Sequence, residues 1–172
     1  MPGNQPDRLP PAQVQSLLVH WVLAAAGQKM PRKEDFRVRS LAAWRGHVAS
    51  VSPSAHGEHS RYLFHAVGKG LTARFGRRMM LKSLKDLAWP ERRSVHALLA
   101  GVRMNCAPKL AWARLPPPGA TWCDLVLPLY DNRFPGGKLI FASYPVAPEE
   151  YDTRGATQAR RSGPAVESRA AL

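Results

Sequence analysis

The six histidines are the side chains of this chain best suited to do chemistry. His56 and His59 lie three positions apart in a glycine-containing stretch, with Glu58 between them. Two imidazoles and a carboxylate could begin a metal site, but a structural site normally has four ligands and no cysteine accompanies these three. We therefore expect a solvated turn here and no metal.

Two other histidines fall in expected helices or strands. His96 lies in an expected helix at 90–105, where it could serve as an axial ligand of haem, although it stands beside the apolar stripe of that helix. His65 lies mid-strand among aromatic residues, and an imidazole with an ordinary pKa of about 6.5 could respond to pH or hold an anionic ligand. A satisfied strand histidine is the simpler interpretation, so the cofactor stays unassigned.

Known catalytic arrangements are missing from the sequence. It has no nucleophile motif, no Cys–His spacing and no paired carboxylates, and its 12 acidic residues supply little for acid–base catalysis. The segment Gly68-Lys69-Gly70 lacks the remaining glycine and the Lys-Ser/Thr ending of a phosphate-binding loop. We expect a protein that is not an enzyme.

The charge is unusual, because 25 Lys and Arg residues against 12 Asp and Glu give a net charge of +13. Two basic clusters, Lys29–Arg45 and Lys69–Arg93, could contact the phosphates of nucleic acid. Neither shows a helix-turn-helix or an interleaved aromatic pattern. A nucleic-acid-binding regulator is therefore the alternative, and a solvated face or a patch for an acidic partner protein is favoured.

The location is expected to be cytoplasmic. Cys106 and Cys123 are too few for a disulfide scaffold, and the expected pairing of strands does not oppose them, so both should be reduced thiols. No run approaches the roughly 20 apolar residues of a membrane span. The segment 17–27 ends in three alanines like a signal peptide, but His20 interrupts it.

The elements that must position these residues begin with a helix. We expect a flexible lead-in at 1–10, a domain at 11–145 and a disordered tail at 146–172. Apolar residues at helical spacing form one face near the start of the domain, and these are the interface candidates: Val14, Leu17, Leu18, Trp21 and Val22. That face must bury against the domain's own sheet or against a second copy of the helix.

Strands and short helices follow. Alternating patterns predict strands at 46–52, 60–67, 107–115, 121–130 and 138–144. Between the second and third strands, helices are expected at 71–75, 81–88 and 90–105, and a short one is possible at 38–44. Five antiparallel strands with helices on one face and an N-terminal amphipathic helix make an α+β domain.

Aromatic and histidine side chains in these elements could line a ligand cavity, although such aromatics more often belong to the core. The pocket candidates are Phe64, His65, Trp89, His96, Trp112, Trp122 and Phe141.

The order of elements and several short motifs resemble the bacterial PAS-domain family of short stand-alone proteins, formerly listed as a domain of unknown function. The motifs are Trp21, Gly27, Pro31-Arg32 with Asp35, Arg61-Tyr62-Leu63-Phe64 running to Gly68, Phe75-Gly76-Arg77 and Leu127-Pro128-Leu129. The chain departs from the family pattern at His65, where an Arg is common, and at Met80-Leu81, where Thr-Gly is common.

The resemblance implies signal sensing and docking, often as a dimer, and rarely catalysis. We expect a PAS-like sensory or docking domain that binds a small ligand, a signalling protein or a second copy of itself. A ligand between the sheet and the 90–105 helix would bias the packing of the N-terminal helix.

Overall fold

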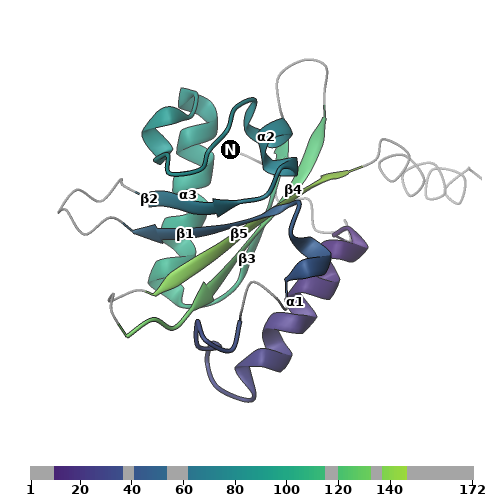
Figure 1. The fold of residues 1–172 in the computed structure, drawn as a ribbon, viewed down its shortest axis with the longest axis vertical. Coiled ribbons are helices and arrows are strands. Elements are labelled where there is room, and N and C mark those ends of the chain that lie inside the picture. The colour runs from purple at the N-terminus through teal and green to yellow at the C-terminus, as the bar shows by residue number, and fades with distance from the viewer. Residues whose placement is uncertain (1–9, 37–40, 54–61, 115–119, 133–136, 147–172) are drawn as a thin grey trace, which may run out of the picture.

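The computed structural model describes residues 10–36, 41–53, 62–114, 120–132 and 137–146 (Figure 1). The turn with His56 and His59 lies outside these ranges, as do the expected lead-in at 1–10 except residue 10 and the expected tail at 146–172 except residue 146, which belongs to the last described strand. The helices of the structure are α1 (Ala12–Ala25), α2 (Gly70–Phe75) and α3 (Trp89–Asn105), with 3₁₀ turns η1 (Ala42–Trp44) and η2 (Leu84–Asp86). Its strands are β1 (Val48–Pro53), β2 (Tyr62–Val67), β3 (Lys109–Arg114), β4 (Thr121–Leu129) and β5 (Lys138–Val146).

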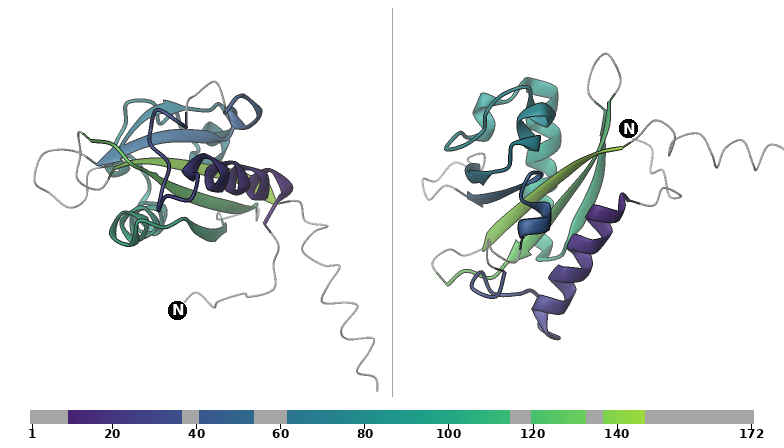
Figure 2. Two further views of the ribbon diagram at one scale, coloured as in Figure 1. Left: turned by 90° about the horizontal axis from the view of Figure 1, so that it is seen from below. Right: turned by 45° about the vertical axis from the view of Figure 1, so that its right-hand side comes forward.

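The five strands form one antiparallel sheet in the order β2-β1-β5-β4-β3. The centre of the sheet therefore joins an early strand to the last one, with Val48 opposite Ala142 and Val51 opposite Leu139. Figure 2 shows α1 on one side of the sheet and α2 and α3 on the other. The expected α+β architecture is confirmed, and we refer to the two faces as the α1 side and the α3 side.

Each side of the sheet has its own apolar core, because successive side chains of a strand point to opposite faces. On the α3 side, Phe64 and Phe141 pack under Leu99 of α3. On the α1 side, Leu17 and Leu127 belong to a second core. All positions of β4 from Trp122 to Leu129 are buried, so both faces of this strand are covered.

Helix α3 has nearly the bounds and the buried face that its sequence predicts. Pro90 lies in its first turn, where a missing N–H costs nothing, and Glu91 favours the same end of the helix dipole. The expected inner stripe is buried: Val95, Leu98, Leu99 and Val102. The helix ends at Asn105, and Cys106 takes a left-handed conformation with φ 49°.

The helix expected at 81–88 is wrong, because the structure has only the 3₁₀ turn η2 in that region. Residues just before η2 run along the free edge of β2 instead. There Leu81 N–H donates to Phe64 O at 2.8 Å, and Phe64 N–H donates to Lys82 O at 3.0 Å. Backbone groups paired with a strand cannot also pair along a helix, so tertiary contacts override the local helical pattern.

Candidate functional site

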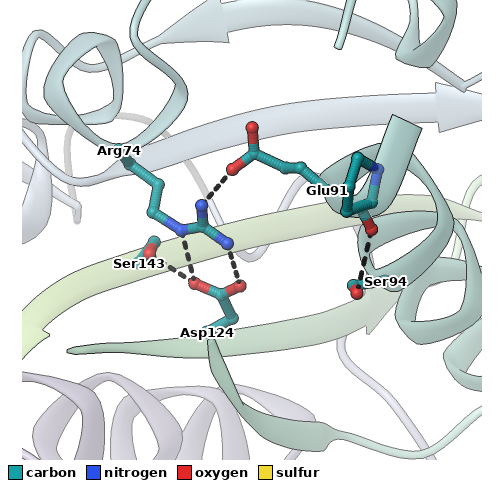
Figure 3. Close-up of polar contacts among 6 residues, drawn as sticks. Arg74, Glu91, Ser94, Asp124 and Ser143 are labelled. Atoms are coloured by element: carbon teal, nitrogen blue, oxygen red, sulfur yellow. Dashed lines mark hydrogen bonds and ion pairs between the residues drawn. The ribbon is translucent and has the colours of Figure 1, made fainter. Parts of the chain in front are cut away.

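On the α3 side, the sheet and helices are joined by a buried ionic cluster (Figure 3). Arg74 of α2 is 2% exposed and donates from Nε and Nη2 to the two carboxylate oxygens of Asp124 on β4, at 3.3 and 2.9 Å. Its Nη1 also contacts Glu91 of α3. Ser143 of β5 donates to Asp124 from its hydroxyl. One guanidinium thus fastens two helices to the two adjacent strands.

Charge pairing holds this cluster together despite its burial. Burial alone lowers the pKa of Arg74, but attraction and hydrogen bonds from Asp124 and Glu91 outweigh it, so the pKa is raised. Burial raises the pKa of Glu91 and only part of this effect is offset by Arg74. The charged group of Arg74 therefore contacts those of Asp124 and Glu91 and stabilises the packing of the helices on this side of the sheet.

The seven pocket candidates do not gather around one cavity. Phe64 and Phe141 are fully buried in the core of the α3 side, where their ring centroids lie 6.2 Å apart. Trp112 packs against the core of the α1 side. Trp122 is 6% exposed, whereas Trp89 is 63% exposed at the start of α3.

The two histidine candidates also lie apart. His96 is half-buried, and its ring lies edge-on to that of Tyr62 with the two centroids 5.9 Å apart. His65 contacts the Ser52 hydroxyl, and its pKa is lowered, first by burial and second by the positive charge of Lys138. Within the described ranges, no cluster of three or more metal-ligating side chains is present. The loop with His56 and His59 falls outside those ranges.

A pocket of about 830 Å³ lies on the α1 side of the sheet, beyond the part that α1 covers. Its apolar lining comes chiefly from Phe36, Leu41, Val48, Leu129 and Ile140. The volume is within the range typical of small-molecule sites, about 300–1,000 Å³. Strands β1 and β5 and the segment after α1 therefore form a cavity of ligand size.

The rim of this pocket is basic. Four of its lining residues are cationic, namely Lys33, Arg45, Lys69 and Lys138, and none of the lining residues is acidic. Close to the rim, the end of β2 passes tightly over the Arg45-Gly46 backbone. A Cβ at Gly68 would overlap the carbonyl oxygens of both residues, so the wall is formed by backbone that tolerates no side chain.

The pocket is physically linked to α1. Phe36 lines it, and its ring centroid lies 5.1 Å from that of His20 on α1. The connecting segment is tied to the end of β4, since Lys33 N–H donates to Tyr130 O at 3.0 Å and Tyr130 N–H donates to Pro31 O at 2.9 Å. A change in the pocket can therefore reach α1 through side-chain contact and through this segment.

The apolar stripe of α1 covers the chain's own sheet. Val14 and Leu17 are fully buried, and Trp21 is 6% exposed and donates from Nε1 to Pro128 O at 2.8 Å. Leu18 is half-buried and Val22 is 56% exposed. Of the two burial partners expected for this stripe, the structure shows the sheet, and only Leu18 and Val22 among the interface candidates keep accessible surface.

The signal for the ionic cluster was present in the sequence. Asp124 is an acid inside an apolar strand, and a buried carboxylate requires a cation or several hydrogen bonds. Its partner Arg74 looked like one member of the basic cluster Lys69–Arg93. The pocket had no such signal, because its walls come from segments far apart in the chain.

Comparison with known proteins finds similar structures only at low sequence identity. No protein-family model and no curated protein matches the chain. Similar solved structures include a light-oxygen-voltage (LOV) domain studied with a flavin analogue, with 11% identity and a TM-score of 0.48, covering 73% of this chain and 95% of that one. The light-state LOV domain of the blue-light photoreceptor Aureochrome1 is 12% identical with a TM-score of 0.44, and the match covers 71% of this chain and 98% of that one. The PAS domain of Bordetella pertussis BvgS is 11% identical with a TM-score of 0.44, and the match covers 86% of this chain and 98% of that one.

The element order and the single five-stranded antiparallel sheet are those expected from the PAS resemblance. The fold is PAS-like. At these identities the likeness concerns architecture alone, and the function must be argued from the site. Across the described parts of this PAS-like domain, no helix is long and apolar enough to cross a membrane.

Proposed function

We propose that this PAS-like chain is a non-enzymatic sensory domain in signal transduction, which binds a small ligand on the α1 side of its sheet and passes the event to α1. One observation carries the proposal: a pocket of ligand size is lined by Phe36 and Lys33, which belong to the segment that follows α1. We place the ligand here and not between the sheet and α3, where the sequence suggested it, because Arg74, Phe64 and Phe141 on that side are each at most 2% exposed.

The mechanism is a shift between two packings of the segment 31–36. A ligand that contacts Phe36 binds one position of that ring better than the other, and His20 on α1 follows the ring. Trp44 adds a second link, since its Nε1 donates to Gln13 O at 3.1 Å and to Ser16 Oγ at 3.0 Å. The output would be a changed position or stability of α1, read by a signalling protein or by a second copy of the chain.

The test begins with native mass spectrometry of the freshly purified full chain, which detects a retained ligand directly. Ala66 of β2 is exposed and lines the pocket, so Ala66→Trp should block it. Ala97 of α3 is exposed on the opposite side of the sheet, so Ala97→Trp is the matched control. A bound mass kept by wild type and Ala97→Trp but lost from Ala66→Trp supports the proposal.

Hydrogen exchange provides the second measurement. Filling the pocket with Trp should alter exchange in residues 31–36 and in α1, because both are linked to Phe36. Unchanged exchange there, together with no bound mass in any of the three proteins, would overturn the proposal. Sedimentation of the same samples tests the expected homodimer.

A nucleic-acid-binding regulator is the second candidate, and the net charge of +13 is the observation that favours it. The structure weakens one of its two clusters, since Arg74 is buried in an ion pair and Arg77 donates to Asp86 O. A salt titration of binding to random duplex decides the matter, because phosphate contacts give a steep loss of affinity with salt. No association at low salt would remove this candidate.

A further inference from the structure

The pocket on the α1 side combines two chemical properties in its lining. Its floor is apolar, since Phe36, Leu41 and Ile140 are each at most 5% exposed and have their neighbours in the core. Its rim holds four cations and no acid. An apolar floor attracts hydrocarbon, and a basic rim attracts negative charge.

The positive charge of the rim is only partly neutralised. Lys33 pairs with Asp131 at 3.3 Å. Arg45 and Lys69 are exposed, and in the described part of the chain no ion pair involves either of them or Lys138. Lys138 is half-buried, and its charge acts on His65 of β2, from which it is separated by β1 in the sheet. Among the described residues, three of the four cations that line the pocket therefore have no ion-pair partner.

We propose that the ligand of this pocket is an amphipathic organic anion, a molecule with a hydrocarbon or aromatic body and a carboxylate or phosphate group. The body lies on Phe36, Leu41 and Ile140, and the anionic group meets Arg45 and Lys138 at the rim. This inference rests on the proposed sensory function and adds the chemical class of the signal.

The alternatives fit the lining less well. A cationic amphiphile would meet like charges at the rim, and an inorganic anion would gain nothing from the apolar floor. A neutral apolar ligand would gain from the floor but nothing from the rim. The lining therefore favours a ligand that carries both properties.

Calorimetric titration of the full chain tests this with a series of ten-carbon probes kept below micelle formation. Decanoate and decyl phosphate carry the anionic group in its two forms, decyltrimethylammonium reverses the charge, and inorganic phosphate removes the chain. We expect an anionic probe to bind roughly tenfold or more tightly than the cationic one, as two or three exposed ion pairs suffice for that factor. The stronger of decanoate and decyl phosphate then identifies the head group.

Charge-reversing variants locate the site. The double variant Arg45→Glu/Lys138→Glu should weaken binding of the better anionic probe by roughly tenfold or more. The matched control Arg78→Glu/Arg93→Glu changes net charge equally at exposed positions that do not line the pocket, and should lose less than about twofold, because distant charges are screened by salt. Circular dichroism checks that both variants are folded.

The outcomes separate this inference from the function on which it rests. Equal or better binding of decyltrimethylammonium, or equal losses in the two double variants, would overturn the anionic ligand. The sensory pocket would still stand if Ala66→Trp removed a natural ligand detected by native mass spectrometry. If Ala66→Trp left decanoate and decyl phosphate binding unchanged, the pocket would not be their site and the inference would fail as well.

Discussion

Replacing Arg74 by Met tests whether the buried ionic cluster holds the two helices onto the sheet. Met keeps the apolar length of the side chain but removes the charge and its hydrogen bonds. Within the part of the chain that the structure describes, Asp124, 3% exposed, would keep only the Ser143 hydroxyl as a side-chain hydrogen-bond donor. Removing one member of a buried ion pair costs about 3–5 kcal/mol, so Arg74→Met should lose that much unfolding free energy near neutral pH. For a domain of this size the melting temperature should fall by roughly 10–20 °C.

Urea unfolding followed by circular dichroism measures the loss. The double variant Arg74→Met/Asp124→Leu removes both charges of the buried pair, and such an apolar replacement is often nearly neutral. It leaves Glu91 without Arg74, but the Glu91 side chain is less buried than that of Asp124, so the double variant should recover all but about 1–2 kcal/mol of the loss. Arg93→Met on the exposed face of α3 is the control and should stay within about 0.5 kcal/mol of wild type. A loss below about 1 kcal/mol in Arg74→Met, or a double variant less stable than the single one, would refute the reasoning.

Three further predictions follow from single contacts. Trp21→Phe should lose about 1–2 kcal/mol of unfolding free energy, measured in urea, since it leaves the buried Pro128 carbonyl without its donor; no loss would mean the bond is dispensable. Burial raises the pKa of Cys123 to about 12, so a thiol reagent should label one cysteine of the native chain, half-buried Cys106, and two in urea, as counted by mass spectrometry. The variant Glu91→Gln tests the raised pKa of Glu91. Because the carboxyl group of Glu91 binds a proton more readily in the folded state than in the unfolded state, the unfolding free energy of wild type should rise relative to that of the variant as pH falls from about 7 towards 4.5. A constant difference across that pH range would contradict this assignment.

Local patterns predicted those elements whose contacts lie within one segment. The helix α3, with Pro90 at its start, could be predicted from the spacing of its apolar residues. The strand β5 could be predicted from its run of apolar residues and the turn residues before it. The 81–88 region failed because its backbone pairs with β2, which no local pattern contains. Arg74 could not be distinguished from exposed arginines, since its burial depends on Asp124, which lies fifty positions later in the chain.

The candidate site was harder to predict than the fold. The sequence placed the pocket among aromatic residues, but aromatic side chains such as Phe64 and Phe141 fill the core of the α3 side instead. The pocket described on the α1 side has an apolar floor and a rim of basic side chains that come from four separate segments. Phe36 and Arg45 lie far from Lys138 in the chain and meet it only in the folded protein, so their spacing in the sequence does not predict the pocket.

The strand order has a consequence for how the protein is made. β1 lies between β2 and β5, and β5 is the last of the five described strands to leave the ribosome. Until β5 emerges, the β1–β2 hairpin and the β3–β4 hairpin share no strand pairing, and each exposes a long unpaired edge. The nascent chain must therefore wait for its final strand to close the sheet, so a translational stop shortly before Lys138 should yield a product that aggregates or is degraded rather than a smaller sensor.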